Sequence, residues 1–237
     1  MSTTTDIARD GAKRARRSPA QRRDEIARAA VALALEEGLS AVTLRAVAAR
    51  AGATPALVAH YVPAMDELVA DTFTAIVDAE LDELAELSSS GSAIVRLATL
   101  LRTVLDGTRD DVTLVWVEAW ALGRRSETLA SAVRGAMDRW QAMLGPLIER
   151  GVAEGAFRVD DVAGAAWQLL GMIDGVNAQS LVRWGGGPAR STLMERAAEG
   201  LLGLPPGALG APSDPPGSPD TSAATAASST PDAGRNA

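Results

Sequence analysis

The chain has 237 residues, of which 47% are hydrophobic but only 3% aromatic, and its formal net charge is −7. It contains no cysteine and a single histidine, which excludes disulfide bonds and thiolate metal sites and argues against histidine-based metal or catalytic sites. Because Ala, Leu and Val must fill the core, the composition favours an all-helical protein of one large or two modest domains. We expect no cofactor and no bound metal.

The charge is distributed unevenly along the chain. Residues 1–65 carry ten basic residues against six acidic ones, a net charge of +4, whereas the rest carries thirteen against twenty-four, a net charge of −11. A basic N-terminal part on an acidic body suggests that only the former meets a polyanion. Residues 1–17, with "KRARR" at 13–17, predict a disordered basic arm, either a solvated tail or one that touches phosphates.

Capping signals predict where the first helices begin. In "SPAQ", Ser18 can cap a helix, a proline suits the first helical position and a glutamine completes a capping box. This helix should end at Gly38. Thr43 caps a second, short helix, "LRAVAARA", and Thr54 caps a third, "PALVAHYV", after the turn at Gly52.

Two short helices joined by a glycine-containing turn, after a longer scaffold helix, predict a helix-turn-helix. Its second helix would lie in the major groove of DNA. Any small helical hairpin in an all-α core has this spacing, but the basic N-terminal part favours DNA. The residues expected to contact DNA are Arg22, Thr43, Arg45, Thr54, Pro55, Ala56, Ala59, His60 and Tyr61.

The remaining chain shows helical periodicity and no alternating strand pattern. A fourth helix should reach about residue 88, and further helices are predicted over 93–106, 110–122, 126–150, 160–184 and 189–202. The most apolar segment, 162–182, contains Asp174, so a buried or interface helix suits it better than a membrane span. With no signal-peptide pattern at the N-terminus, the protein should be cytoplasmic without a membrane partner. Residues 204–237 predict a disordered tail.

Residues 20–80 resemble the DNA-binding domain of TetR-family transcriptional repressors, and "TLRAVAARAGATPALVAHYVPAMDELV" aligns with the family signature without a gap. The "AHY" is most similar to the branch of choline-responsive betaine-pathway repressors. "MIDGVNAQSL" resembles a family C-terminal helix. The sequence departs from the pattern at Ala59, Val62 and Met65, where family members usually have Tyr, Phe and Lys. Because the Tyr and Lys commonly contact phosphate, their loss should weaken sequence-independent DNA affinity.

The resemblance implies a homodimeric, ligand-released repressor of an operator. A helix-turn-helix domain over 18–65 would precede a ligand-binding and dimerisation domain over 66–203. The alternative is a helical ligand- or protein-binding dimer whose DNA binding is weakened or lost. We find no catalytic constellation and expect no enzyme.

Two further sets of residues follow from the family layout. Tryptophans could stack on an apolar or cationic effector, or simply fill the core, and a buried Asp174 would require a cationic partner. The expected pocket residues are Trp116, Trp120, Trp140, Trp167 and Asp174. The expected dimer-interface residues are Leu169, Leu170, Met172, Ile173 and Leu181.

Overall fold

The computed structural model describes residues 18–184 and 187–210, with only the backbone given for 187–190. No strand occurs within these ranges, so the all-helical prediction is confirmed. The elements are α1 (Pro19–Glu37), a 3₁₀ turn η1 (Leu39–Ala41), α2 (Leu44–Arg50), α3 (Pro55–Tyr61), α4 (Met65–Leu87), α5 (Ala93–Leu105), α6 (Asp110–Gly123), α7 (Glu127–Ala153), α8 (Val162–Ser180) and α9 (Gly187–Leu201).

The predicted caps are present at the N-terminal helices. The backbone N–H of Gln21 donates to Ser18 Oγ, and the Ser18 N–H donates back to Gln21 Oε1 at 2.8 Å, which completes the capping box. The hydroxyls of Thr43 and Thr54 each accept the N–H three residues later. Gly52, at φ +59°, makes the left-handed turn between α2 and α3 that favours glycine.

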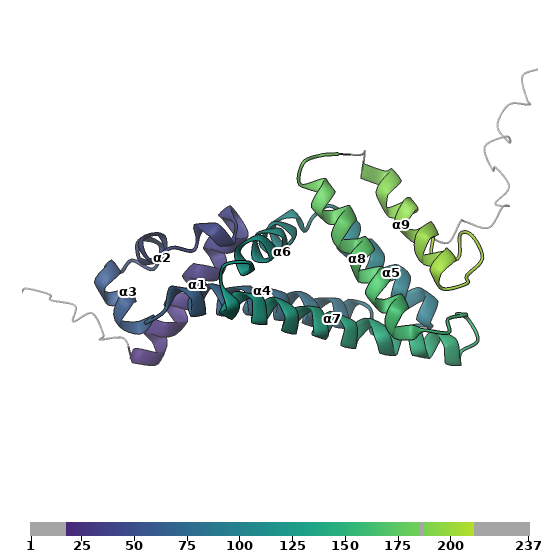
Figure 1. The fold of residues 1–237 in the computed structure, drawn as a ribbon, viewed down its shortest axis with the longest axis horizontal. Helices are drawn as coiled ribbons and strands as arrows, with labels where there is room; N and C mark the ends of the chain where they lie inside the picture. The colour runs from purple at the N-terminus through teal and green to yellow at the C-terminus, as the bar shows by residue number, and fades with distance from the viewer. Residues whose placement is uncertain (1–17, 185–186, 211–237) are drawn as a thin grey trace, which may run out of the picture.

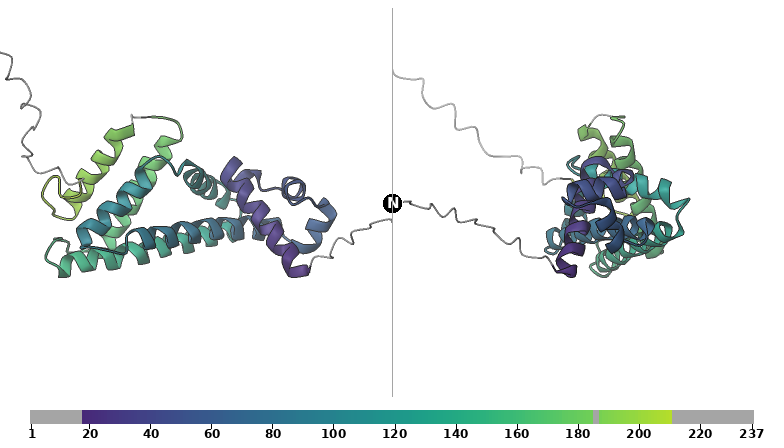
Figure 2. Two further views of the ribbon diagram at one scale, coloured as in Figure 1. Left: turned by 180° about the vertical axis from the view of Figure 1, so that it is seen from behind. Right: turned by 90° about the vertical axis from the view of Figure 1, so that its left-hand side faces the viewer.

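The molecule is elongated, with α1, α2 and α3 gathered at one end and α5, α8 and α9 at the other (Figures 1 and 2). The long helices α4 and α7 run side by side between the two ends, and α6 packs on both α1 and α8. We call α1 to α3 the head and the rest the body. In the described ranges, no helix has both the length and the hydropathy needed to cross a membrane.

Order extends past the predicted start of the tail at residue 204. After α9, the chain folds back so that Leu204 and Leu209 are buried. The N–H groups of Gly207 and Leu209 each donate at 2.9 Å to the carboxylate of Glu199, which is itself buried. Residues 1–17 and 211–237, which hold the predicted arm and the rest of the predicted tail, lie outside the described residues.

This fold-back predicts different results for two truncations. Ending the chain after Gly210 should leave the thermal midpoint within about a degree or two, since all described contacts remain. Ending it after Gly203 removes the Leu209 side chain and both donors to Glu199, which should cost about 3 kcal/mol or more. Thermal melts followed by circular dichroism should show a drop of roughly 6–12 °C for the shorter chain alone. Equal midpoints would contradict a stabilising role for 204–210.

Candidate functional site

The exposed face of α3 is thin, because most of its side chains are small. Four of the predicted DNA-contacting residues, Pro55, Ala56, Ala59 and His60, are exposed, while Val58 is fully buried and holds the helix on the head. The Thr54 side chain is exposed at the N-terminus of α3, where it caps the helix. A helix with small outward side chains can approach base edges closely, which is what a helix in the major groove needs.

The basic residues of the head differ in how far their side chains are exposed to a DNA ligand. Arg45 is exposed on α2 beside the exposed cap Thr43. Arg22 is largely buried and donates to Glu25 at 2.8 Å, so it could reach a phosphate only by leaving that carboxylate. Arg23 was not among the predicted DNA-contacting residues, and its guanidinium lies 5.8 Å from the ring centre of Tyr61. The sequence signal for Arg23 was the pair Arg22-Arg23. Adjacent residues on a helix point in different directions, so when Arg22 faces inward, Arg23 is exposed.

His60 and Tyr61 contact each other edge to face, with ring centres 5.2 Å apart. Tyr61 is half-buried, and beside it a groove with an empty volume of about 680 Å³, partly open to solvent, runs between α1 and the start of α4. Val62 and Pro63 line this groove.

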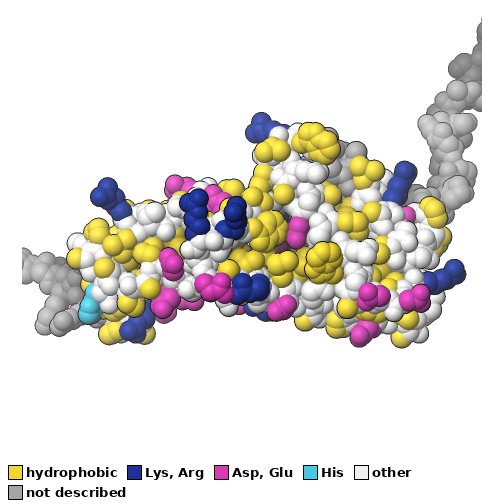
Figure 3. Space-filling model, viewed as in Figure 1, with side chains coloured by type: hydrophobic (Ala, Val, Ile, Leu, Met, Phe, Trp, Pro, Cys, Tyr) yellow, Lys and Arg dark blue, Asp and Glu magenta, His cyan; other side chains and the backbone are white. Residues whose placement is uncertain are grey.

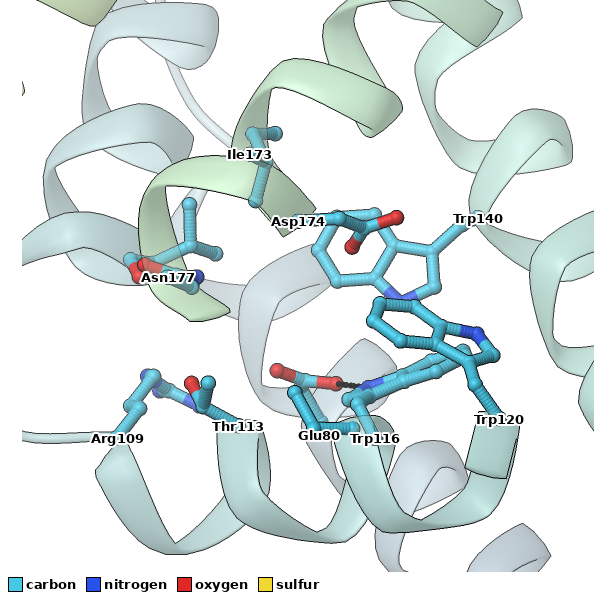
Figure 4. A pocket seen from close by; sticks show the side chains of 11 residues that line it. Glu80, Arg109, Thr113, Trp116, Trp120, Trp140, Ile173, Asp174 and Asn177 are labelled. Carbon is cyan, nitrogen blue, oxygen red and sulfur yellow. Dashed lines mark hydrogen bonds between the residues drawn. The ribbon is translucent and has the colours of Figure 1, made fainter. Parts of the chain in front are cut away.

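A second recess, with an empty volume of about 430 Å³ that includes open solvent, lies in the body between α4, α6, α7 and α8 (Figure 4). We call it the tryptophan pocket. Its lining residues are Glu80, Val104, Arg109, Thr113, Trp116, Val117, Trp120, Trp140, Ile173, Asp174 and Asn177. Trp116 and Trp120 have ring centres 5.8 Å apart at a tilt of 44°, and Phe73 supports Trp116 edge to face at 5.0 Å.

Two carboxyl groups enter the tryptophan pocket from different helices. Glu80 on α4 is buried and accepts a hydrogen bond from Trp116 Nε1 at 3.2 Å. Burial raises its pKa, and the Trp116 bond and the charge of Arg109 oppose that rise. Burial, and secondly the negative charge of Glu80, raises the pKa of Asp174 on α8 to about 7. Asp174 has no hydrogen-bond or ion-pair partner among the described residues.

The structure brings together four of the five predicted pocket residues: Trp116, Trp120, Trp140 and Asp174. The expectation for Trp167 was wrong, because its side chain is 68% exposed on the outside of α8. Glu80 was missed within the acidic run "DAELDELAEL", although it falls four residues before the buried Leu84 and so shares its inward face. Among the residues described, no three His, Cys, Asp or Glu side chains are arranged to hold a metal ion.

The predicted interface residues of α8 need correction. Leu169, Leu170 and Ile173 are buried within one subunit, so they are unavailable to a second copy, and Met172 and Leu181 are only half-buried. The outer side of α8 carries Trp167, Gly171 and Gly175 instead, followed by the exposed Val182 and Trp184, with Leu193 exposed on α9. Over α8 the surface in Figure 3 is largely uncharged.

Two family models match the chain. Residues 26–72 match the model of bacterial regulatory proteins of the TetR family, and residues 93–203 match that of the C-terminal domain of BetI-type transcriptional repressors. No curated protein matches the sequence significantly.

Solved structures share the fold. A TetR-family regulator from Rhodococcus sp. has a TM-score of 0.66 at 20% identity, with 76% of this chain and 98% of that chain covered. A transcriptional regulator from Saccharomonospora viridis, solved in complex with choline, has a TM-score of 0.66 at 24% identity, covering 75% and 94%. The family models, the helix-turn-helix and the helical body agree, and the chain belongs to the TetR family of transcriptional regulators.

Proposed function

We propose that this regulator is a cytoplasmic repressor that binds its operator as a dimer and is released by a small molecule in the tryptophan pocket. The head over 18–65 would read DNA, and the body over 66–203 would bind the effector and the second copy. The observation that carries the DNA-binding part is the capped, thin and exposed face of α3 on a helix-turn-helix. The "AHY" of α3 and the BetI-type model favour the choline-responsive branch.

Helix α6 offers a direct connection between effector and DNA. It carries Trp116 and Trp120 in the tryptophan pocket, and between them Glu118 accepts from Ser40 of the head. The Ser40 N–H donates at 2.7 Å and the Ser40 hydroxyl at 2.9 Å. An effector that shifts α6 would therefore move η1, which follows the scaffold helix α1. Release would follow from the changed spacing of two heads in a dimer.

The dimer would form through the outer sides of α8 and α9. Gly171 and Gly175 allow two α8 helices to approach closely, while Trp167 and Leu193 supply apolar area. Stable dimers bury about 1,200–2,000 Å² in total, which two helices from each copy can provide.

Variants of α3 test the DNA-binding part. Thr54→Ala and His60→Ala should each weaken operator binding by about 5- to 30-fold, measured by fluorescence anisotropy at fixed salt, because each removes one polar contact. Thr54→Ala also loses the helix cap, which costs about 1 kcal/mol. Thr54→Ser, which keeps the capping hydroxyl, and Ser89→Ala on a loop of the body serve as controls. Unchanged affinity in both alanine variants would reject this docking of α3.

The alternative, a dimer that has lost DNA binding, is supported by Ala59 and Met65, which replace residues that commonly contact phosphate in the family. A gel-shift assay with the DNA flanking its own gene separates the two functions. A shift that weakens with rising salt supports the repressor, because phosphate contacts release counterions. No shift at any salt concentration, with a folded dimer, would favour the alternative.

A further inference from the structure

The groove between α1 and the start of α4, with an empty volume of about 680 Å³, has walls of different charge. We call it the head groove. Its α1 wall carries Arg23, and its α4 wall carries Glu67 and Asp71, all three with exposed side chains. The small exposed residues Ala27 and Ala75 also line it. The head groove is therefore open to solvent, lined in part by small side chains, and acidic along α4.

The two carboxylates of the α4 wall have no cationic partner among the described residues. Glu67 and Asp71 are four positions apart on α4, so their side chains are neighbours and their charges repel each other. Neither side chain accepts a hydrogen bond or forms an ion pair within the described ranges, and Arg23 lies over the ring of Tyr61 instead. Glu67 is in the first turn of α4, where the helix dipole offsets part of its charge, so Asp71 is the stronger attractor of a cation. The α4 wall favours a basic occupant.

Residues 1–17, which we call the arm, are a basic segment attached close to the head groove. They carry five basic residues against two acidic ones, a net charge of +3. The arm joins the described chain at Ser18, and Ala27 lies about 14 Å from Ser18 along α1. Residues 13–17, "KRARR", can span up to about 17 Å, so their charges can reach the α4 wall. Ile7, further from Ser18, can reach the apolar residues of the groove.

We propose that the arm binds in the head groove of the DNA-free protein, with its basic residues against Glu67 and Asp71, and that a polyanion displaces it. Exposed ion pairs are individually weak. The arm is tethered beside its site, however, and a short tether provides an effective concentration in the mM range. A weak contact is therefore well populated. The same arginines cannot pair with α4 and with phosphates, so DNA gains the arm only by taking it from the groove.

Disulfide cross-linking of the full-length protein tests the proposal, because the chain contains no cysteine of its own. The variant Ala12→Cys/Ala75→Cys places one thiol on the arm and one in the head groove. Oxidation by copper-phenanthroline in air should join them within one chain, and this product keeps the mass of one chain on a non-reducing gel. A disulfide between two copies doubles the mass, so the two products are distinguishable.

The matched control is Ala12→Cys/Ala85→Cys. Ala85 is also an exposed alanine of α4, but it lies about 15 Å further along the helix. Because the groove holds the arm close to position 75, the Ala75 pair should form its intramolecular disulfide about fivefold faster or more. Circular dichroism would confirm that both variants are folded. Equal rates for the two pairs would overturn the proposal.

Charge variants of the Ala75 pair identify what holds the arm. Asp71→Asn together with Glu67→Gln should slow the cross-link about threefold or more, with Asp71→Asn giving the larger part. Asp82→Asn, at another exposed position of α4, should leave the rate unchanged. High salt should slow the cross-link as well, since it screens exposed charges. An undiminished rate in the double-neutralised variant would overturn the assignment of the α4 wall.

Heparin, a polyanion without base sequence, tests displacement independently of any operator. It should slow the Ala75 cross-link in proportion to its concentration, and a rate that heparin leaves unchanged would overturn displacement. A gel shift on the same samples keeps this proposal apart from the proposed function. Selective cross-linking without a DNA shift would refute DNA binding and leave the arm's site standing. A DNA shift with equal cross-linking at positions 75 and 85 would do the reverse.

Discussion

A Trp167→Glu variant is expected to be a folded monomer that has lost operator binding. Trp167 is 68% exposed in the subunit, so a glutamate there costs the folded monomer little. In the proposed dimer the same side chain lies between two α8 helices, where truncation of a central tryptophan costs about 2 kcal/mol or more, a loss of roughly 30-fold in affinity. A buried charge adds to this loss. Because a lone head reads only half of an operator, DNA binding should fall in the same step.

Light scattering would measure the molar mass of the variant, and circular dichroism would measure the helical content of the same sample. Val95→Glu is the matched control, because Val95 is a half-exposed apolar residue near the start of α5, a helix that is not part of the proposed interface. It should remain dimeric and bind the operator. Leu170→Glu should instead unfold the body, because Leu170 is 4% exposed within one subunit. If Trp167→Glu stayed dimeric with normal operator affinity, the interface would lie elsewhere.

Trp167 is exposed and Leu170 is buried, and this difference in burial could not be predicted from the sequence. Helix α8 is apolar on more than one face, because one face closes the subunit core and the other is free for a second copy. Periodicity identifies an inward side only when the opposite side is polar. The sequence therefore predicted the helix, but it assigned Leu169, Leu170 and Ile173 to an outer side, whereas they are buried in the core of the subunit.

The head was predicted in more detail because its signals are local. A cap such as Thr54 acts on an N–H three residues later, so its effect can be recognised in four consecutive residues. The tryptophan pocket depends on contacts between residues that are distant in the sequence, such as Glu80 and Trp116, which are 36 positions apart. Aromatic composition indicated that a pocket could exist, but only the packing of α4 against α6 shows which carboxylate lies inside.

Gly38→Ala is expected to lower stability and DNA binding together. Gly38 joins α1 to η1 at φ +91° and ψ 165°, a backbone conformation that only glycine adopts without strain of about 1–3 kcal/mol. A methyl group there would also lie 2.6 Å from Glu118 Oε2 and displace the carboxylate that holds Ser40. The variant should therefore lose both a relaxed turn and the link between head and α6.

Gly52→Ala is the matched control for Gly38→Ala. Gly52 also has a positive φ, but no atom lies within 4 Å of the added methyl group, so only the backbone strain applies. The double variant Gly38→Ala/Glu118→Ala separates strain from collision, since it removes the carboxylate as well. Melting temperature and operator affinity would be measured for each. If Gly38→Ala cost no more than Gly52→Ala, and DNA binding still responded to the effector as before, the Glu118–Ser40 contact would not couple the body to the head.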